Sequence, residues 1–260
     1  MRTYENVRSF PSPTSCARAF VLDRLTEATQ LFAIRRWWKV PCLLCGRHVP
    51  EPICDDCRAV LPLNERACRV CALPLLGPEL PDGRCGACFA KPPPFGRTVA
   101  AFRYDAPLDR LIHRVKFGGG LVEADALGAL LAETLADAYR DATLPEAIVP
   151  VPLSWRRLVV RGHNQATSIA RVPAKRLGLP ILHTLCRRVR HTSPQTGLSR
   201  RARIRNLAHA FDVRGNAPPR VAIFDDVMTT GATARALSRV LLAHGAADVH
   251  VWVVARTRVR

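Results

Sequence analysis

Eight cysteines form four Cys-x-x-Cys pairs between residues 42 and 88, and no other feature restricts the fold of the chain as strongly. The surrounding segment 40–91 has too few large apolar residues for an independent core, so we expect bound metal to stabilise it. Two such pairs supply the four thiolates of a closed tetrahedral zinc site, which leaves no position for a catalytic water. Eight thiolates therefore predict two structural zinc ions. The predicted ligands are Cys42, Cys45, Cys54, Cys57, Cys68, Cys71, Cys85 and Cys88.

A redox dithiol is the alternative use of a Cys-x-x-Cys pair. It requires one pair at a strand–helix junction, whereas here four pairs follow one another in a segment rich in turns. Gly46, directly after Cys45, suits the tight turn of a metal-binding knuckle. The sequence does not determine which pairs share an ion. Cys16 and Cys186 lie apart from the pairs and are expected to be ordinary thiols.

The chain carries a formal net charge of +18, from 39 Lys and Arg against 21 Asp and Glu. Such an excess favours polyanionic partners such as nucleic acids. Genome composition is an alternative explanation, because Arg and Ala are both abundant. The local density is harder to explain in that way, since residues 187–205 contain seven Arg and His191.

No apolar run approaches the ~20 residues that a membrane-spanning helix needs, and the N-terminus lacks the apolar segment of a secretory signal. We therefore expect a cytoplasmic protein. Residues 1–39 form a polar arm followed by an amphipathic helical pattern that ends at Trp37, Trp38 and Lys39. Such a helix most often packs on its own neighbouring domain, and a peripheral position at the inner membrane is the alternative.

After the stiff linker at residues 92–94, segments typical of strands alternate with segments typical of helices. The alternation predicts an α/β domain over residues 98–260, with a parallel sheet and helices on both of its faces. Pro173 lies inside one predicted helix, where we expect a kink or an early end. The expected strands are 98–104, 147–152, 181–185, 220–224 and 248–255, and the expected helices are 107–116, 121–140, 164–177 and 233–244.

One strand–loop–helix segment, residues 220–233, has the composition of a phosphate-binding site. Consecutive backbone N–H groups at a helix start form an anion cradle, Thr hydroxyls add donors, and Gly231 lets the backbone approach closely. Asp225 and Asp226 at the strand end are placed to bind ribose hydroxyls or to orient Mg²⁺ through its waters. The predicted site residues are Asp225, Asp226, Thr229, Thr230, Gly231, Ala232 and Thr233.

The string Phe224-Asp-Asp-Val-Met-Thr-Thr-Gly-Ala-Thr233 resembles the phosphoribosyl pyrophosphate (PRPP) motif of type I phosphoribosyltransferases. Together with the cysteine pairs and four further segments, it makes the chain similar to the ComF family over about residues 40–260. The resemblance implies a type I phosphoribosyltransferase fold, a double zinc ribbon over residues 40–91 and an association with DNA uptake during natural transformation. The four further segments are Pro150–Trp155, Arg161–Ala166, Ser193–Ser199 and Arg203–Phe211.

The same resemblance assigns residues 150–157 to the loop that receives pyrophosphate and residues 191–206 to a hood that closes over PRPP. The sequence departs from the family pattern at His163, where Phe is usual, and at Pro173. Both departures concern local packing rather than the phosphate cradle. A solvated Lys116 is the alternative to one that reaches the ligand. The side chains expected to neutralise the diphosphate are Arg200, Arg201, Arg203, Arg205 and Lys116.

Two functions fit these features. The first is a ComF-like protein that binds PRPP and Mg²⁺ and handles single-stranded DNA beside proteins of the DNA-uptake machinery, with bases stacking on aromatic residues such as Trp155 and Phe117. The second is an active phosphoribosyltransferase that modifies an acceptor and has no role with DNA. No residue identifies an attacking nucleophile, so the sequence leaves open whether the protein is an enzyme.

Overall fold

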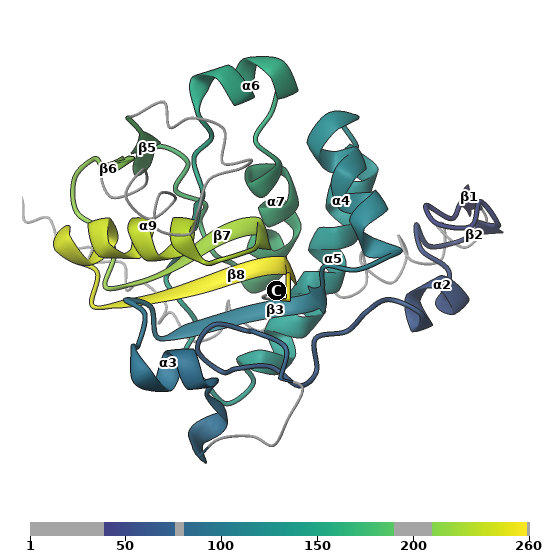
Figure 1. Ribbon diagram of the computed structural model, residues 1–260. Coiled ribbons are helices and arrows are strands. Elements are labelled where there is room, and N and C mark those ends of the chain that lie inside the picture. Colours follow the sequence, from purple (N-terminus) through teal and green to yellow (C-terminus); the bar gives the residue numbers. More distant parts are fainter. Residues whose placement is uncertain (1–38, 76–80, 190–209, 259–260) are drawn as a thin grey trace, which may run out of the picture. The chain divides into compact units, whose positions relative to one another are not determined.

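The computed structural model describes residues 39–75, 81–189 and 210–258 (Figure 1). The chain divides into two compact units, residues 1–54 and 55–260. In the described part of the first unit, β1 (Val40–Pro41) and β2 (His48–Val49) form a short antiparallel pair. All elements from residue 55 onward belong to the second unit.

The second unit alternates helices and strands along most of its length. No helix among the described residues is long and apolar enough to cross a membrane. The helices are α2 (Asp55–Ala59), a 3-10 turn η1 (Pro81–Gly83), α3 (Gly86–Ala90), α4 (Leu108–Phe117), α5 (Leu121–Ala138), α6 (Trp155–Arg161), α7 (Gln165–Leu177) and α9 (Ala232–Ala243). The strands are β3 (Arg97–Arg103), β4 (Ala147–Pro150), β5 (Cys186–Arg188), β6 (Phe211–Val213), β7 (Arg220–Met228) and β8 (Asp248–Arg256).

The central sheet has four strands in the order β3-β8-β7-β4, and every neighbouring pair is parallel. The register places Phe224 of β7 opposite Trp252 of β8 and Pro150 of β4. The strands are almost continuously apolar, as expected for a parallel sheet that is covered on both faces. The predicted parallel α/β domain is confirmed.

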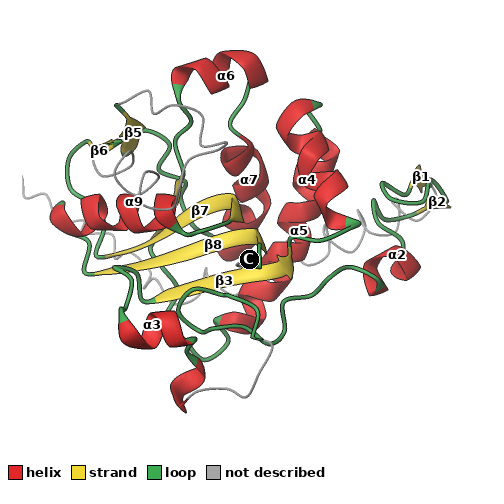
Figure 2. Ribbon diagram, in the orientation of Figure 1, coloured by secondary structure: helices red, strands yellow, loops and turns green. Residues whose placement is uncertain are grey.

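Different helices cover the two faces of the sheet (Figure 2). Odd-numbered residues of β7 and β8, such as Ile223 and Val251, share a core with Leu237 and Leu241 of α9. Even-numbered residues point to the other face, because successive side chains of a strand alternate. There the indole N–H of Trp252 donates to the Tyr139 hydroxyl at the end of α5 (2.9 Å).

The second cysteine group belongs to the core on the α9 face. Cys68, Cys71, Cys85 and Cys88 are buried in one cluster with strand residues such as Val251 and with Leu237 of α9. The segment around these cysteines therefore does not depend on metal alone, since it shares its apolar contacts with the sheet.

Two features of the middle of the chain differ from the predicted pattern. The strand expected over residues 181–185 is absent: Ile181 makes only an isolated bridge with Ile148, the chain then turns, and β5 begins at Cys186. Of the kink or early end expected at Pro173, the early end is not observed, because α7 continues to Leu177.

Close contact between α5 and α7 explains how the proline is accommodated. Pro173 has no N–H for the carbonyl of Ile169, one helical turn earlier. That carbonyl faces Gly128 of α5, where an added Cβ would lie only 2.6 Å from the oxygen. Gly128 therefore leaves room for this carbonyl and for Cδ of Pro173, which an added Cβ would approach to 3.3 Å.

Candidate functional site

The candidate phosphate site is the turn from β7 into α9. Gly231 is the N-cap of α9 and has a left-handed backbone (φ 73°), which strongly favours glycine. An added Cβ there would lie 2.6 Å from Cε of Met228. The N–H of Ala232 donates to the Thr230 hydroxyl (3.3 Å), so the turn is ordered by its own side chains.

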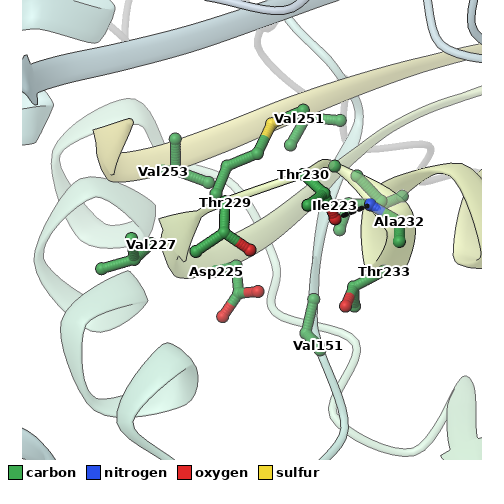
Figure 3. Close-up of a pocket in the computed structure, with 13 residues that line it drawn as sticks. Val151, Ile223, Asp225, Val227, Thr229, Thr230, Ala232, Thr233, Val251 and Val253 are labelled. Carbon is green, nitrogen blue, oxygen red and sulfur yellow. Dashed lines mark hydrogen bonds between the residues drawn. The ribbon is translucent and has the colours of Figure 1, made fainter. Parts of the chain in front are cut away.

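A pocket opens at this turn, and residues of β7, β8, α9 and the end of β4 line it (Figure 3). It contains six of the seven predicted site residues, and Asp226 does not line it. The N–H groups of the first helical turn lack intrahelical acceptors, so the pocket has the donors that a phosphate needs. The six residues are Asp225, Thr229, Thr230, Gly231, Ala232 and Thr233.

Asp225 and Asp226 have different surroundings. Asp225 lies within β7 on the same face as the other odd-numbered residues, and it lines the pocket. Asp226 is 4% exposed, and its Oδ2 lies 2.7 Å from Nζ of Lys116 in α4. The alternative of a solvated Lys116 is therefore not observed, since its side chain is 22% exposed and forms an ion pair with Asp226. Whether Lys116 reaches a diphosphate stays a prediction.

The carboxyl group of Asp225 ionises less readily than that of an exposed aspartate. Burial, followed by the negative charge of Asp226, raises the pKa of Asp225 well above its ordinary value. A cation in the pocket would relieve this penalty, because an opposite charge favours the ionised form. Among the described residues, Asp225 is the carboxylate that lines the pocket and could hold a cation there.

Arg161, at the end of α6, is a half-buried cation that sequence reasoning did not single out. Its guanidinium lies 5.0 Å from the ring centre of Phe117. Burial lowers the pKa of Arg161, and the negative charge of Asp226 opposes this shift. The signal in the sequence was its place in the segment 161–166.

The segment 161–166 holds the predicted pyrophosphate loop in place. Asn164 caps α7 by accepting from the N–H of Ala166 (3.1 Å), and its amide donates to the carbonyl of Val151 (3.0 Å), which lines the pocket. The ring nitrogens of His163 lie 2.9 Å and 2.8 Å from the carbonyl oxygens of Arg161 and Val115. His163 thus joins the segment 161–166 to the end of α4, just before Lys116.

Replacing Lys116 by Met is expected to destabilise the fold. The variant leaves Asp226 buried without its cation, and breaking a largely buried pair costs about 3 kcal/mol. Adding Asp226→Asn removes the stranded charge and is expected to restore most of the lost stability. Urea unfolding measures each variant, with Lys175→Met on the exposed side of α7 as the control, expected within about 0.5 kcal/mol of the parent. Equal effects of the two lysine variants would show that the ion pair contributes nothing.

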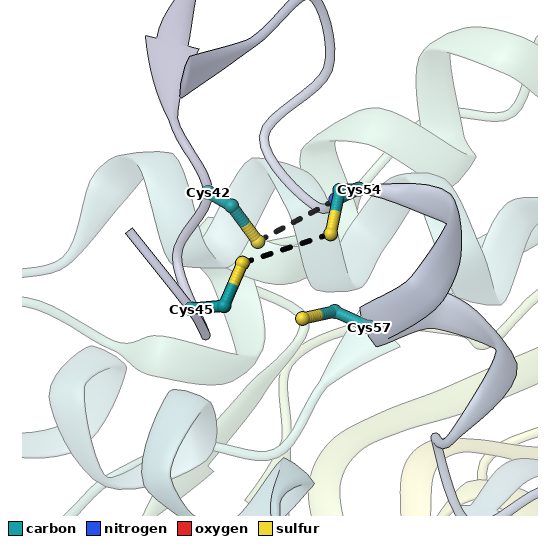
Figure 4. A group of neighbouring side chains, drawn as sticks. All are labelled: Cys42, Cys45, Cys54 and Cys57. Carbon is teal, nitrogen blue, oxygen red and sulfur yellow. Dashed lines mark hydrogen bonds between the residues drawn. The ribbon is translucent and has the colours of Figure 1, made fainter. Parts of the chain in front are cut away.

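The eight paired cysteines form two groups of four, one of which is shown in Figure 4. Within each group the Sγ atoms lie within 4.8 Å of one another. Cys45 and Cys54 are separated by 3.7 Å between sulfurs, as are Cys71 and Cys85. A tetrahedral site with Zn–S bonds of ~2.3 Å has an S···S edge of ~3.8 Å, so both groups have the geometry of a four-thiolate ion site. The groups are Cys42, Cys45, Cys54, Cys57 and Cys68, Cys71, Cys85, Cys88.

The two groups repeat the same local structure. The residue after the second cysteine has a left-handed backbone in each case: Gly46 (φ 77°) in the first and Ala72 (φ 53°) in the second. Its N–H donates to the carbonyl of Cys42 (2.9 Å) or of Cys68 (2.7 Å). The predicted role of Gly46 is confirmed, and Ala72 adopts the same turn although a left-handed alanine costs about 1–2 kcal/mol.

The protein also stabilises thiolates in both groups. A hydrogen bond from Cys71, opposed by burial and reinforced by backbone N–H groups, lowers the pKa of Cys68 to about 4. The same bond, together with burial, raises the pKa of Cys71. Burial raises the pKa of Cys42, but backbone N–H groups outweigh it and lower the value to about 6. Each group thus presents at least one thiolate as the first ligand of a cation.

The predicted hood side chains Arg200, Arg201, Arg203 and Arg205 lie outside the described residues, as does the N-terminal arm. Two other arginines of the basic stretch are described. Arg187 forms an exposed ion pair with Asp212 (2.7 Å). Arg188 lies 5.6 Å from the ring centre of Phe211, and burial followed by the charge of Arg157 lowers its pKa.

Comparison with known proteins identifies the family. No protein-family model matches the chain. DNA utilization protein YhgH of Salmonella typhimurium is 40% identical over 210 residues, which cover 79% of this chain and 90% of that protein. Competence protein ComFC of Bacillus subtilis is 26% identical over 239 residues, which cover 84% of this chain and 96% of that protein. The chain belongs to the ComF family.

A third ComF-family relative is Competence protein F of Haemophilus influenzae, 39% identical over 178 residues, which cover 66% of this chain and 78% of that protein. Among solved structures, TT1426 from Thermus thermophilus is 18% identical with a TM-score of 0.31 over 53% of this chain and 84% of that one. A purine phosphoribosyltransferase from Pyrococcus horikoshii is 17% identical with a TM-score of 0.30, over 51% of this chain and 82% of that one. Scores this low carry no argument. The predicted fold, of phosphoribosyltransferase type with a cysteine-rich N-terminal part, rests on ComF membership, the parallel sheet and the cysteine groups.

Proposed function

We propose that this ComF-family protein binds PRPP with Mg²⁺ at the turn from β7 into α9 and acts in DNA uptake, where it handles single-stranded DNA. The observation that carries the proposal is the pocket at Gly231, where a helix start, three threonines and Asp225 converge. The names of the relatives, which refer to competence and DNA utilization, support the cellular role.

In this proposal the phosphate lies on the loop 229–233, and Asp225 faces the ribose and the hydrated Mg²⁺. Lys116 neutralises Asp226 and presents its remaining N–H donors toward the diphosphate. The hood arginines named above complete the diphosphate site. The two cysteine groups hold one zinc ion each, within ribbons that span residues 40–91, and the phosphoribosyltransferase-type domain spans residues 98–260. A cytoplasmic or peripheral inner-membrane position and contacts with uptake-machinery proteins belong to the same proposal.

The surface proposed for single-stranded DNA is α6. Trp155 is 69% exposed, and its neighbours Arg156 and Arg157 are exposed as well. An exposed indole beside two guanidinium groups combines base stacking with phosphate neutralisation. Arg187 is less suited to this role because Asp212 already neutralises it.

Single-stranded DNA is expected to bind with micromolar affinity and more tightly than duplex, because stacking needs unpaired bases. Changing Trp155 to Ala and both neighbouring arginines to Gln should lower the affinity at least tenfold. It should also reduce the slope of log affinity against log salt by about 1.4, or ~0.7 per lost phosphate contact. Mobility-shift assays at several salt concentrations measure both quantities.

The control variant removes two exposed arginines elsewhere, Arg110→Gln on α4 and Arg171→Gln on α7. It has the same net charge as the α6 variant and should keep most of the affinity. Equal losses in both variants would assign binding to net charge alone. Absence of binding at low salt would reject the DNA-handling role.

A transferase activity is the second candidate, and one observation favours it. Arg157, at the end of the predicted pyrophosphate loop, and Arg161 lie four residues apart on α6, so they share one face of that helix. Cations gathered beside a phosphate site suit the stabilisation of departing pyrophosphate. A screen for pyrophosphate release from PRPP in the presence of amines, bases or single-stranded DNA distinguishes catalysis from binding alone.

A further inference from the structure

Arg256 is a buried cation that pairs with no carboxylate in the described part of the chain. It ends β8, lies opposite Met228 of β7 and is 3% exposed. Among the described residues no carboxylate lies within 4.0 Å of its guanidinium, because none of the ion pairs involves it. A buried cation costs several kcal/mol unless other groups compensate it, so its contacts should identify what it stabilises.

The guanidinium donates to backbone carbonyl groups from two functional regions. Its Nε donates to the carbonyl of Cys71 (3.0 Å), in the knuckle of the second cysteine group. Its Nη1 donates to the carbonyls of Met228 (3.0 Å) and Thr229, where β7 passes into the phosphate loop, and to that of Thr257 (2.8 Å). One rigid, planar group therefore joins the cysteine knuckle to the base of the phosphate loop.

The second cysteine group also supplies negative charge. Four thiolates around a divalent ion carry a formal charge of two minus, so a loaded site would attract the guanidinium strongly. Loss of the ion would change both the position of the Cys71 carbonyl and the charge that holds Arg256.

We propose that Arg256 is a positioning residue that makes the geometry of the phosphate loop depend on the metal in the second cysteine group. The inference rests on the proposed function for its ligand, PRPP, and on the hydrogen bonds of Arg256 for the coupling itself. The first cysteine group serves as the comparison, since no hydrogen bond joins Arg256 to it among the described residues.

The test compares the parent chain with Arg256→Lys, which keeps the charge but loses the planar fork. Amide hydrogen exchange over residues 229–233 reports the loop without any ligand, and calorimetry with PRPP and Mg²⁺ reports binding. We expect Arg256→Lys to speed exchange in this loop about tenfold and to weaken PRPP about tenfold, with both metal ions retained. Cys42→Ser with Cys45→Ser, in the other group, should leave loop exchange unchanged.

Chelation of the parent chain gives an independent measurement that needs no variant. Exchange over residues 229–233 should rise when the ion of the second group leaves, and chelation should add little in Arg256→Lys. If neither chelation nor Arg256→Lys changes the rate of amide exchange over residues 229–233, the proposal is wrong. If the parent chain binds no PRPP but its loop responds to chelation, the coupling stands and the proposed ligand is wrong.

Discussion

The purified chain is expected to contain two zinc ions, and removing ligands from the two sites should have very different consequences. Zinc binding contributes roughly 10–16 kcal/mol at a structural site, so each loss is large. Replacing Cys42 and Cys45 by Ser should unfold the segment around the first group and leave the phosphoribosyltransferase-type domain folded. Replacing Cys68 and Cys71 by Ser should destabilise that domain as well.

The difference follows from where the cysteines lie. The second group is buried in the same core as Val251 of β8 and Leu237 of α9, and the Thr98 hydroxyl of β3 donates to the carbonyl of Val70 between its first two cysteines (2.7 Å). Disturbing that knuckle therefore reaches the sheet directly. The first group is not part of this core cluster.

Metal analysis and thermal unfolding of both double variants decide the matter. Each variant should retain one zinc ion, and the unfolding of the sheet should shift strongly only for Cys68→Ser with Cys71→Ser. A parent chain with a single zinc ion would mean that one group is unoccupied, and none at all would remove the ribbon assignment. Equal thermal shifts in the two variants would contradict the shared core.

The sequence predicted the features that depend on local pattern. The apolar strands β7 and β8, the parallel sheet, the turn at Gly231 and the knuckle at Gly46 each follow from composition and spacing within a few residues. Helix α6 was not predicted, because its first residues, 155–157, were assigned by resemblance to the pyrophosphate loop over residues 150–157. None of its residues is buried, so it lacks the apolar face by which helices are recognised.

Contacts between distant segments could not be predicted in the same way. The partner of Asp226 is Lys116, 110 positions earlier in the numbering, and Arg256 bonds to Cys71, 185 positions earlier. Such pairs depend on which strands lie side by side at the carboxyl edge of the sheet. The sequence did offer one sign, since Arg256 directly follows an apolar strand and is placed to enter the interior.

Replacing Asp225 by Asn is expected to weaken PRPP binding about 100-fold in Mg²⁺ and, at the same time, to stabilise the unliganded protein. Binding weakens because the variant loses the only carboxylate that lines the pocket among the described residues. Stability rises by about 1 kcal/mol, a usual gain when an unfavourable functional group is removed. Asp225→Asn is a cleaner variant than a double change with Asp226→Asn, which would also leave Lys116 unpaired.

The stabilisation should depend on pH in a direction fixed by the raised pKa of Asp225, which burial and the charge of Asp226 cause. In the unfolded chain this carboxyl ionises near its ordinary value of ~3.9, whereas the folded protein holds its proton to higher pH, so the parent loses stability as pH rises through this interval. Asn cannot ionise, so its advantage should vanish near pH 4 and grow toward neutral pH. Urea unfolding across this range measures it, with the exposed Asp137→Asn as the control. A difference independent of pH would show that Asp225 is not held protonated, and unchanged PRPP affinity would limit this acid to a structural role in the loop.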